Sequence, residues 1–261
     1  MASRPRQSSQ GEGSGYLSLG KPRVLAHRGL AIDAPENTLL AFARAIAAGA
    51  QYVETDVHAS HDGAAVIAHD PDLTRVAERD VKVEQLNIAE LRRVDLGFGQ
   101  GFCSLSDALD GFPETRFNID IKSSAAIEPT VRAILDMKAS DRVLVSSFSE
   151  TRRVAALRGL PGVVSSASAP RFATALVAGK VGLSPVVRRA LSGLVAVQVP
   201  ERALGLRTTT ARMLARLHDA GVEVHVWTVN EPQRMRELFE LGVDGIVTDR
   251  ADLALEVVRS L

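Results

Sequence analysis

The sequence has 261 residues and carries 31 basic against 31 acidic side chains, so its formal net charge at pH 7 is zero. A chain without a charge excess has no long-range field to attract nucleic acid or an anionic membrane, so any anion it recognises must be bound by a local cluster of charges. Setting aside the first twenty residues leaves about 240, the usual size of one α/β barrel. Apolar residues make up 46% of the sequence, enough for one large buried core.

The N-terminal residues differ in composition from the rest of the chain. Residues 1–20 are rich in Ser, Gly, Gln and Arg and contain no apolar run of the kind a secretory signal requires. We predict a flexible tail over 1–20 and one barrel domain over 21–261. Cys103 is the only cysteine, which excludes an internal disulfide and fits a reducing compartment. Since the most apolar stretch, 173–183, is too short to span a bilayer, we expect a cytoplasmic protein without a stable membrane anchor.

From Val24 onward, short β-branched runs alternate with longer segments of helical periodicity. This rhythm is typical of parallel strands joined by crossover helices. The predicted strands cover 24–29, 52–60, 116–122, 142–149, 162–168, 194–199, 222–229 and 244–249. The helical segments include 37–49, for which Asn37 is the expected N-cap, and 128–139, 210–221 and 231–242. Eight strands with helices between them predict an α/β fold of the (β/α)8 TIM-barrel type.

One run interrupts this alternation. Residues 64–70 follow the second strand after only Asp62-Gly63, a dipeptide that predicts a two-residue hairpin turn. Because a parallel strand needs a crossover of about a dozen residues or more, we expect 64–70 to be antiparallel and to carry His69 over the barrel mouth. The segment that follows, up to Leu105, is predicted to be a small rim excursion with one helix over 83–94.

Acidic side chains alternate along the second predicted strand. Glu54, Asp56 and His58 are two residues apart, so they point to one face, which we expect to be the inward face. Asp120 ends the third strand, and barrel sites lie at the C-terminal strand ends. Three carboxylates suit Mg²⁺ or Ca²⁺, whereas no Cys/His cluster suggests zinc. We predict a divalent-cation site at Glu54, Asp56 and Asp120; the alternative is a polar layer in which Glu54 and Asp56 only pair with arginines.

Basic side chains gather at the same end of the predicted barrel. His27 and Arg28 close the first strand, Lys122 ends the third, and the hairpin carries His69. Imidazole is the side chain whose unperturbed pKa lies near neutrality, so His27 and His69 are the candidates for acid–base catalysis. The grouping matches an anionic substrate, a metal and proton transfer together. Trp227, at the end of the seventh strand, either stacks on the substrate or fills the barrel core.

The remaining histidines are weaker candidates for catalysis. We expect His61, beside the hairpin turn, to be solvated and His218 to lie on an amphipathic helix. His225 faces either the barrel interior or the helices. His58 is expected beside the metal site as a supporting residue.

The run from Ala26 to Asp70 resembles the opening signature of the glycerophosphodiester phosphodiesterase family. It contains His-Arg-Gly at 27–29, Pro-Glu-Asn-Thr at 35–38, Glu54-x-Asp56, Asp62-Gly63 and His69-Asp70, followed by Leu73 and Arg75. Similarity continues more thinly through 118–122, 146–148, 227–230 and 242–249, so it spans nearly the whole chain after the tail. The resemblance implies a TIM barrel of the PLC-like phosphodiesterase type.

The same resemblance implies a role for each candidate residue. His27 and His69 would carry acid–base catalysis, and Arg28 and Lys122 would contact the phosphate. The carboxylates Glu54, Asp56 and Asp120 would bind the divalent cation. The family usually has Glu where Asp120 stands, and the shorter side chain puts the affinity and preference for the metal in question.

The implied reaction is the metal-dependent hydrolysis of a small-molecule glycerophosphodiester to glycerol 3-phosphate and an alcohol. The attacking group is either water or the glycerol 2-hydroxyl, which would give a cyclic phosphate. One alternative is a lysophospholipase D or sphingomyelinase D-like activity on a lipid phosphodiester, which a wide apolar groove would favour. A second is a phosphate-ligand binding protein that has lost catalysis, against which the complete set of His27, His69, Glu54 and Asp56 argues.

Overall fold

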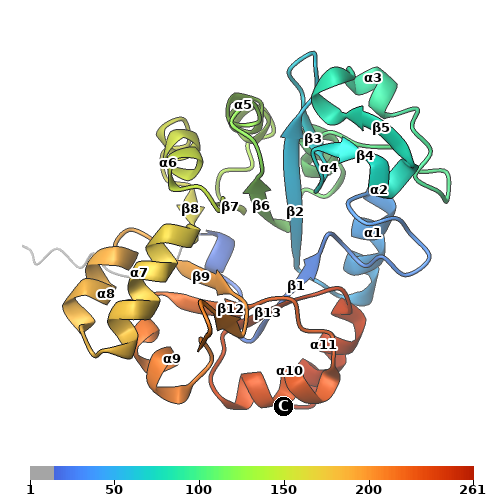
Figure 1. The fold of residues 1–261 in the computed structure, drawn as a ribbon. Coiled ribbons are helices and arrows are strands. Elements are labelled where there is room, and N and C mark those ends of the chain that lie inside the picture. The colour runs from blue at the N-terminus through green and yellow to red at the C-terminus, as the bar shows by residue number, and fades with distance from the viewer. Residues whose placement is uncertain (1–14) are drawn as a thin grey trace, which may run out of the picture.

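Eight short parallel strands surround the centre of the molecule in the computed structural model, which describes residues 15–261 (Figure 1). The strands are β1 (Arg23–His27), β2 (Tyr52–Ala59), β6 (Arg116–Ile121), β7 (Val143–Ser146), β8 (Val164–Ser165), β9 (Ala196–Val199), β12 (Glu223–Val226) and β13 (Gly245–Thr248). Their order in the sheet is β8-β7-β6-β2-β1-β13-β12-β9. A parallel bridge between Ser166 and Ala196 joins the two ends. The barrel is therefore nearly closed, and the predicted (β/α)8 fold is confirmed.

Helices lie around the outside of these strands (Figure 1). They are α1 (Leu39–Ala48), α5 (Ile127–Asp136), α6 (Glu150–Arg158), α7 (Ala169–Lys180), α8 (Ser184–Leu191), α9 (Ala211–His218), α10 (Pro232–Glu240) and α11 (Ala251–Arg259), with α4 (Leu105–Gly111) leading into β6. Outward-facing strand residues such as Val53, Val57 and Ile119 pack against the helices in the largest buried cluster. No helix within 15–261 combines the length and apolar character needed to cross a bilayer.

The start of α1 differs from the prediction. Thr38, not Asn37, is the N-cap, and its hydroxyl accepts a hydrogen bond from the Ala41 N–H at 3.2 Å. Asn37 has a left-handed backbone (φ 57°) and turns its side chain toward β2. The amide of Asn37 is thereby freed from capping and becomes available to the barrel mouth.

Part of the inner face of the barrel near its floor is apolar. Leu25, Tyr52, Leu144 and Val247 occupy inward positions and form a cluster with Tyr16, which is 0% exposed. Residues two apart on a strand share a face, so Glu54 and Asp56 follow Tyr52 on the inward face, nearer the C-terminal end of β2.

Residues 15–20 close this floor, although the sequence places them in a flexible tail. The short 3-10 helix η1 (Gly15–Leu17) carries Tyr16, whose ring packs edge-on against Tyr52 with centroids 5.3 Å apart. The Arg23 guanidinium donates to the carbonyls of Leu17 and Leu19 at 3.0 and 2.8 Å. The predicted tail is therefore wrong for 15–20, because a barrel whose floor was open would expose its inner apolar layer; residues 1–14 lie outside the described part.

The predicted hairpin after β2 is present. Strand β3 (Ala65–Ile67) pairs antiparallel with β2, with Val57 opposite Ile67. Its turn has three residues, 61–63, instead of the expected two: the Gly63 N–H bonds the Ser60 carbonyl, and the Ser60 N–H bonds the Ala64 carbonyl. Gly63 supplies the left-handed backbone (φ 76°) that such a turn requires. His69 follows β3 after one residue, Ala68.

The excursion after His69 contains more elements than predicted. A small hairpin of β4 (Asp72–Leu73) and β5 (Arg79–Lys82) encloses α2 (Thr74–Ala77). The helix predicted over 83–94 is wrong: it divides into η2 (Val83–Gln85) and α3 (Ile88–Leu91), because the Asn87 side chain caps a new start by accepting from the Glu90 N–H at 2.9 Å. This layer has its own small core around Val66, Leu73 and Phe102.

Candidate active site

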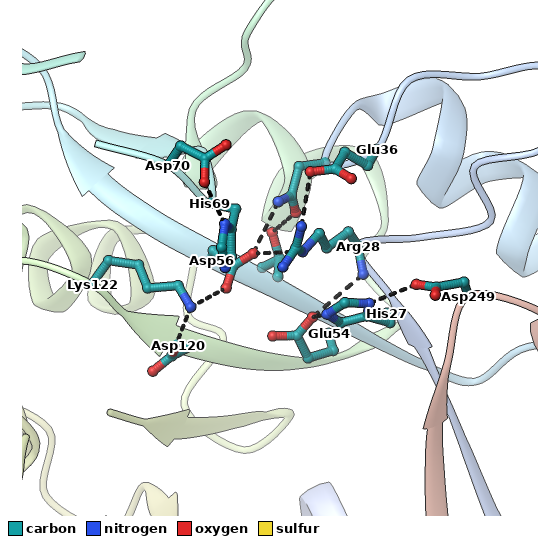
Figure 2. Close-up of polar contacts among 12 residues, drawn as sticks. His27, Arg28, Glu36, Glu54, Asp56, His69, Asp70, Asp120, Lys122 and Asp249 are labelled. Carbon is teal, nitrogen blue, oxygen red and sulfur yellow. Dashed lines mark hydrogen bonds and ion pairs between the residues drawn. The ribbon is translucent and has the colours of Figure 1, made fainter. Parts of the chain in front are cut away.

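A cavity of about 530 Å³ opens at the C-terminal ends of the barrel strands. Its lining includes every site residue predicted from the sequence: His27, Arg28, Glu54, Asp56, His69, Asp120, Lys122 and Trp227. These side chains come from β1, β2, the segment after β3, β6 and the end of β12. The fold therefore brings all of them together, and Figure 2 shows most of them in contact.

His27, the last residue of β1, is held by a carboxylate from β13's end. Its Nδ1 lies 2.6 Å from Asp249 Oδ1, and its Nε2 lies 3.9 Å from Glu54 Oε2. Burial alone would lower the pKa of His27, but the Asp249 hydrogen bond and the Glu54 charge raise it above its ordinary value. Asn230 orients the carboxylate by donating to Asp249 Oδ2 at 2.8 Å. The contact at Nδ1 leaves Nε2 as the nitrogen for proton transfer.

His69 has the same arrangement. Its Nδ1 lies 2.7 Å from Asp70 Oδ1, and Asp70 Oδ2 accepts from Arg75 Nε at 2.6 Å. The His58 ring lies 3.2 Å from the His69 carbonyl oxygen, which steadies the backbone of this segment. Each of the two predicted catalytic histidines thus has a carboxylate on Nδ1, the pairing by which a carboxylate fixes the tautomer and orientation of an imidazole base.

Arg28 adopts a left-handed backbone (φ 56°), which is uncommon for a side chain of its size. The turn is tight because the next residue, Gly29, approaches α1 so closely that a Cβ would lie 2.7 Å from the Ala41 backbone. The guanidinium donates from Nη1 to Glu36 Oε1 at 2.9 Å, and its Nε lies 3.2 Å from Asp56 Oδ2. The turn and the two carboxylates fix this cation at the rim of the cavity.

Three buried carboxylates share the floor of the cavity with one lysine. Asp56 on β2 and Asp120 on β6 are directly paired across the two strands. Lys122 Nζ lies between them, 2.8 Å from Asp56 Oδ1 and 2.8 Å from Asp120 Oδ2 (Figure 2). Glu54 lies two residues before Asp56 on β2, on the same inward face and further from the cavity mouth. The sequence prediction that these carboxylates face inward is confirmed.

The electrostatics of this floor favour an additional positive charge. Burial and the nearby charge of Asp56 raise the pKa of Glu54 well above its ordinary value. Burial also raises the pKa of Asp120, against the opposing effect of Lys122. Asp56 is buried as well, but the charges of Lys122 and Arg28 hold its pKa below its usual range. One lysine and one arginine therefore neutralise Asp56 but not the whole group of carboxylates.

The donor set fits a hard divalent cation. Asp120 Oδ1 is buried and has no hydrogen-bond partner, so one carboxylate oxygen is left over at the floor. Glu54, Asp56 and Asp120 offer only oxygen donors, the type that Mg²⁺ and Ca²⁺ select. Among the described residues no three acidic, histidine or cysteine side chains already converge as a metal cluster, since Lys122 lies between two of the carboxylates. A cation would be held by Glu54, Asp56 and the free oxygen of Asp120.

Supporting residues that the sequence analysis did not assign complete the site. Asp249 and Asp70 hold the two histidines, and Glu36 accepts from both Arg28 and Arg75, at 2.9 and 2.6 Å. Asn37 donates to Asp56 Oδ2 at 3.1 Å. The signals for them lay in motifs already noted, since Glu36 and Asn37 stand in Pro-Glu-Asn-Thr, Asp70 follows His69, and Asp249 ends the last strand.

The other histidines lie away from the lining of the cavity. His61 is exposed, as predicted, and His218 on α9 pairs with Asp244 at 2.7 Å. His225 is fully buried inside the barrel, 3.1 Å from Glu223, which resolves its predicted choice of face.

Trp227 fills part of the barrel core, one of its two predicted roles, whereas stacking on the substrate stays a prediction. It packs against the inner cluster of the barrel and also lines the cavity. Its ring meets Phe148 edge-on with centroids 6.2 Å apart. Both aromatic side chains line the cavity, and the Phe148 ring lies 5.9 Å from Lys122 Nζ.

The arrangement defines a barrel enzyme site for a phosphoester or a similar anion, with two oriented imidazoles and oxygen donors for a cation. The model of the glycerophosphoryl diester phosphodiesterase family matches residues 27–253. The probable glycerophosphodiester phosphodiesterase 2 of Mycobacterium tuberculosis is 41% identical over 245 residues, which cover 93% of this chain and 93% of that protein. The chain belongs to the glycerophosphoryl diester phosphodiesterase family and is an enzyme of that class.

Solved structures agree with this assignment. The glycerophosphodiester phosphodiesterase of Thermotoga maritima is 28% identical with a TM-score of 0.70, covering 90% of this chain and 97% of that one. A phosphodiesterase of Oleispira antarctica, solved with the product sn-glycerol-3-phosphate, has a TM-score of 0.76 at 22% identity and covers 92% of this chain and 97% of that one. The second likeness supports the fold.

Proposed function

We propose that this enzyme hydrolyses glycerophosphodiesters to glycerol 3-phosphate and an alcohol in the presence of a divalent cation. The observation that carries the proposal is the pair of histidines, each with a carboxylate on Nδ1, in one cavity with Arg28, Lys122 and three carboxylates. The family supports the reaction class, and the product bound by the Oleispira antarctica phosphodiesterase supports glycerol 3-phosphate as the product.

Arg28 and Lys122 are proposed to bind the phosphate. Arg28 is immobilised by Glu36, and Lys122 by Asp56 and Asp120, so both cations are in place before substrate arrives. Positive charges that need no reorganisation stabilise the negative charge that builds on the equatorial oxygens during phosphoryl transfer.

A cation held by Glu54, Asp56 and Asp120 would act as a Lewis acid on a phosphoryl oxygen. The metal would be Mg²⁺ or Ca²⁺, because the donors are all carboxylate oxygens. The unpartnered oxygen of Asp120 supports this assignment. The raised pKa of Glu54, caused by burial and by the charge of Asp56, also supports it, because the surrounding side chains do not offset the cost of ionising Glu54.

His27 and His69 are proposed to move the protons through their Nε2 atoms. One histidine accepts the proton of the attacking group, water or the glycerol 2-hydroxyl, and the other donates a proton to the oxygen of the departing alcohol. Asp249 and Asp70 stabilise whichever ring carries the positive charge. If the 2-hydroxyl attacks, phosphorus NMR should detect a cyclic phosphate early in turnover.

The test measures glycerol 3-phosphate released from glycerophosphocholine by the metal-stripped protein with and without added Mg²⁺ or Ca²⁺. We expect activity only with a cation, and a loss of about 10²- to 10⁴-fold in kcat for His27→Ala and for His69→Ala. His61→Ala is the matched control, because His61 is an exposed histidine outside the cavity. Wild-type turnover by both cavity variants, or binding of the diester without any release of glycerol 3-phosphate, would contradict the proposal.

A further inference from the structure

Positive charge is concentrated in one part of the molecule. Residues 169–218, from the start of α7 to the end of α9, contain eight Lys and Arg but one acidic residue, Glu201, although the whole sequence has 31 of each kind. Glu201 is paired with Arg234 on α10. The stretch forms α7, α8, β9, a small hairpin of β10 (Arg202–Ala203) and β11 (Leu206–Arg207), and α9. Its helices lie next to one another (Figure 1), so a chain without net charge has one positive side.

The connection between α7 and α8 exposes aliphatic side chains. Val177, Val181, Leu183 and Val186 are between 40% and 67% exposed. Val177 and Val181 are one helical turn apart, Leu183 lies in the turn between the helices, and Val186 lies in the first turn of α8. These four residues therefore gather at the end of the helical hairpin, and we call them the α7–α8 tip. A group of exposed apolar side chains at one place marks a surface of interaction.

Cations stand beside these apolar side chains. Lys180 follows Val177 by three residues on α7, and Arg189 follows Val186 by three on α8. This spacing puts two side chains on the same face of a helix. Arg188 and Arg189 are exposed, and Lys180 is half-buried. None of these three cations has a carboxylate partner within residues 15–261. Their charge is therefore available to a partner outside the chain.

The combination of aliphatic side chains and available cations fits the surface of an anionic bilayer. Apolar side chains enter the boundary between headgroups and acyl chains, while the long stems of Lys and Arg keep their charges at the lipid phosphates. A single-stranded nucleic acid fits less well, because it stacks its bases on aromatic side chains. The large apolar side chains exposed between α7 and α9 are all Val or Leu.

We propose that the α7–α8 tip binds reversibly to anionic lipid surfaces. The four apolar side chains insert into the headgroup boundary, and Lys180, Arg188 and Arg189 bind the lipid phosphates. The inference does not rest on the proposed function, because no residue of the tip lines the catalytic cavity. However, α7 also lines that cavity through Phe172 and Leu176, so a membrane bound at the tip lies near the cavity.

The first test needs only the wild-type protein. It is floated with vesicles of phosphatidylglycerol and phosphatidylcholine in equal parts, and with vesicles of phosphatidylcholine alone. At about fivefold per cation, the partition coefficient should be on the order of a hundredfold higher on the anionic vesicles. This difference should shrink as salt screens the charges. Equal flotation with both kinds of vesicle overturns the inference. So does no flotation with the anionic vesicles, whether the protein then binds DNA, self-associates or does neither.

The second test locates the charge that binds the vesicles. The double variant Arg188→Gln/Arg189→Gln should lower the partition coefficient on anionic vesicles by about 25-fold. The matched control Arg79→Gln/Arg93→Gln removes two exposed arginines from the excursion around β5 and α3, which lies away from α7 and α8 (Figure 1). It should bind vesicles like the wild type, and both variants should hydrolyse glycerophosphocholine at the wild-type rate. Equal losses of binding in the two variants would show that net charge alone attracts the protein, and would overturn the inference.

The third test examines the apolar part of the tip. Val181→Ser/Leu183→Ser keeps every charge, and both side chains are exposed, so the fold should keep its wild-type circular dichroism. If the two side chains enter the bilayer, this variant should bind anionic vesicles at least about tenfold more weakly, and salt should not remove the difference. Wild-type binding by this variant would contradict insertion of the tip.

Discussion

Replacing Asp249 by Asn should remove most of the activity without changing the shape of the site. The hydrogen bonds around Asn230 decide how the new amide would point. Asn230 Oδ1 already accepts from Thr248 Oγ1 and from the Asp249 N–H, at 3.0 and 2.9 Å, so its Nδ2 must donate to residue 249. The amide oxygen in Asp249→Asn therefore faces Asn230, and its NH₂ group faces His27.

This orientation reverses the role of the His27 ring. Its Nδ1 has to accept a hydrogen bond instead of donating one, so the neutral ring carries its proton on Nε2 and is the wrong tautomer for a base. The charge-assisted hydrogen bond that is lost is worth about 1.5–3 kcal/mol, or about 10- to 100-fold in rate, and the tautomer change adds to it. We expect kcat/KM to fall about 10²-fold or more.

The pH profile gives an independent readout of the same change. The Asp249 contact raises the pKa of His27, so removing the charge should lower that pKa. The limb of the kcat/KM profile that reports His27 should then move to lower pH, whether the ring acts as base or as acid. Asp110→Asn, an exposed carboxylate on α4, is the control. A loss below about threefold with both limbs in place would refute the positioning role of Asp249.

Three further outcomes follow from the geometry. Asp120→Glu should shift the concentration of Mg²⁺ or Ca²⁺ for half-maximal activity by about tenfold, because the extra methylene moves the unpartnered oxygen; an unchanged metal titration in this variant and in Asp120→Ala would exclude Asp120 from the cation site. Tyr16→Ala should lower the free energy of urea unfolding by about 3–5 kcal/mol, because it empties the barrel floor. Tyr16→Phe should be neutral or stabilising, because the buried hydroxyl lacks a partner; an equal loss of unfolding free energy in the two variants would argue against packing as the cause. Burial would raise the pKa of Asp244, but Lys21 and the Val224 N–H hold it below its ordinary value. The stability that the Asp244 charge contributes is therefore present above the unfolded pKa of about 3.9 and lost as pH falls through the folded pKa. Asp244→Asn should destabilise the protein at pH 7 and flatten its loss of stability in acid; an equal destabilisation at pH 7 and in acid would contradict this.

Local patterns in the sequence were enough to predict the barrel and to name residues that line one cavity. The alternation of β-branched runs with helical segments encodes eight strands, since burial imposes a period of two on a strand and 3.6 on a helix. Glu54 and Asp56 share a face for the same reason, and Asp62-Gly63 encodes the hairpin that leads to His69. Such signals depend only on neighbours along the chain.

The partners of those residues were decided by the tertiary structure. Asp249 reaches His27 across 222 residues, because barrel closure places β13 beside β1. Lys122 lies between two carboxylates because the parallel register of β2 and β6 sets Asp56 opposite Asp120. Tyr16 closes a floor that exists only once all eight strands have assembled. Which side chains meet depends on the register of neighbouring strands and on closure of the barrel, and the spacing of residues along one strand determines neither.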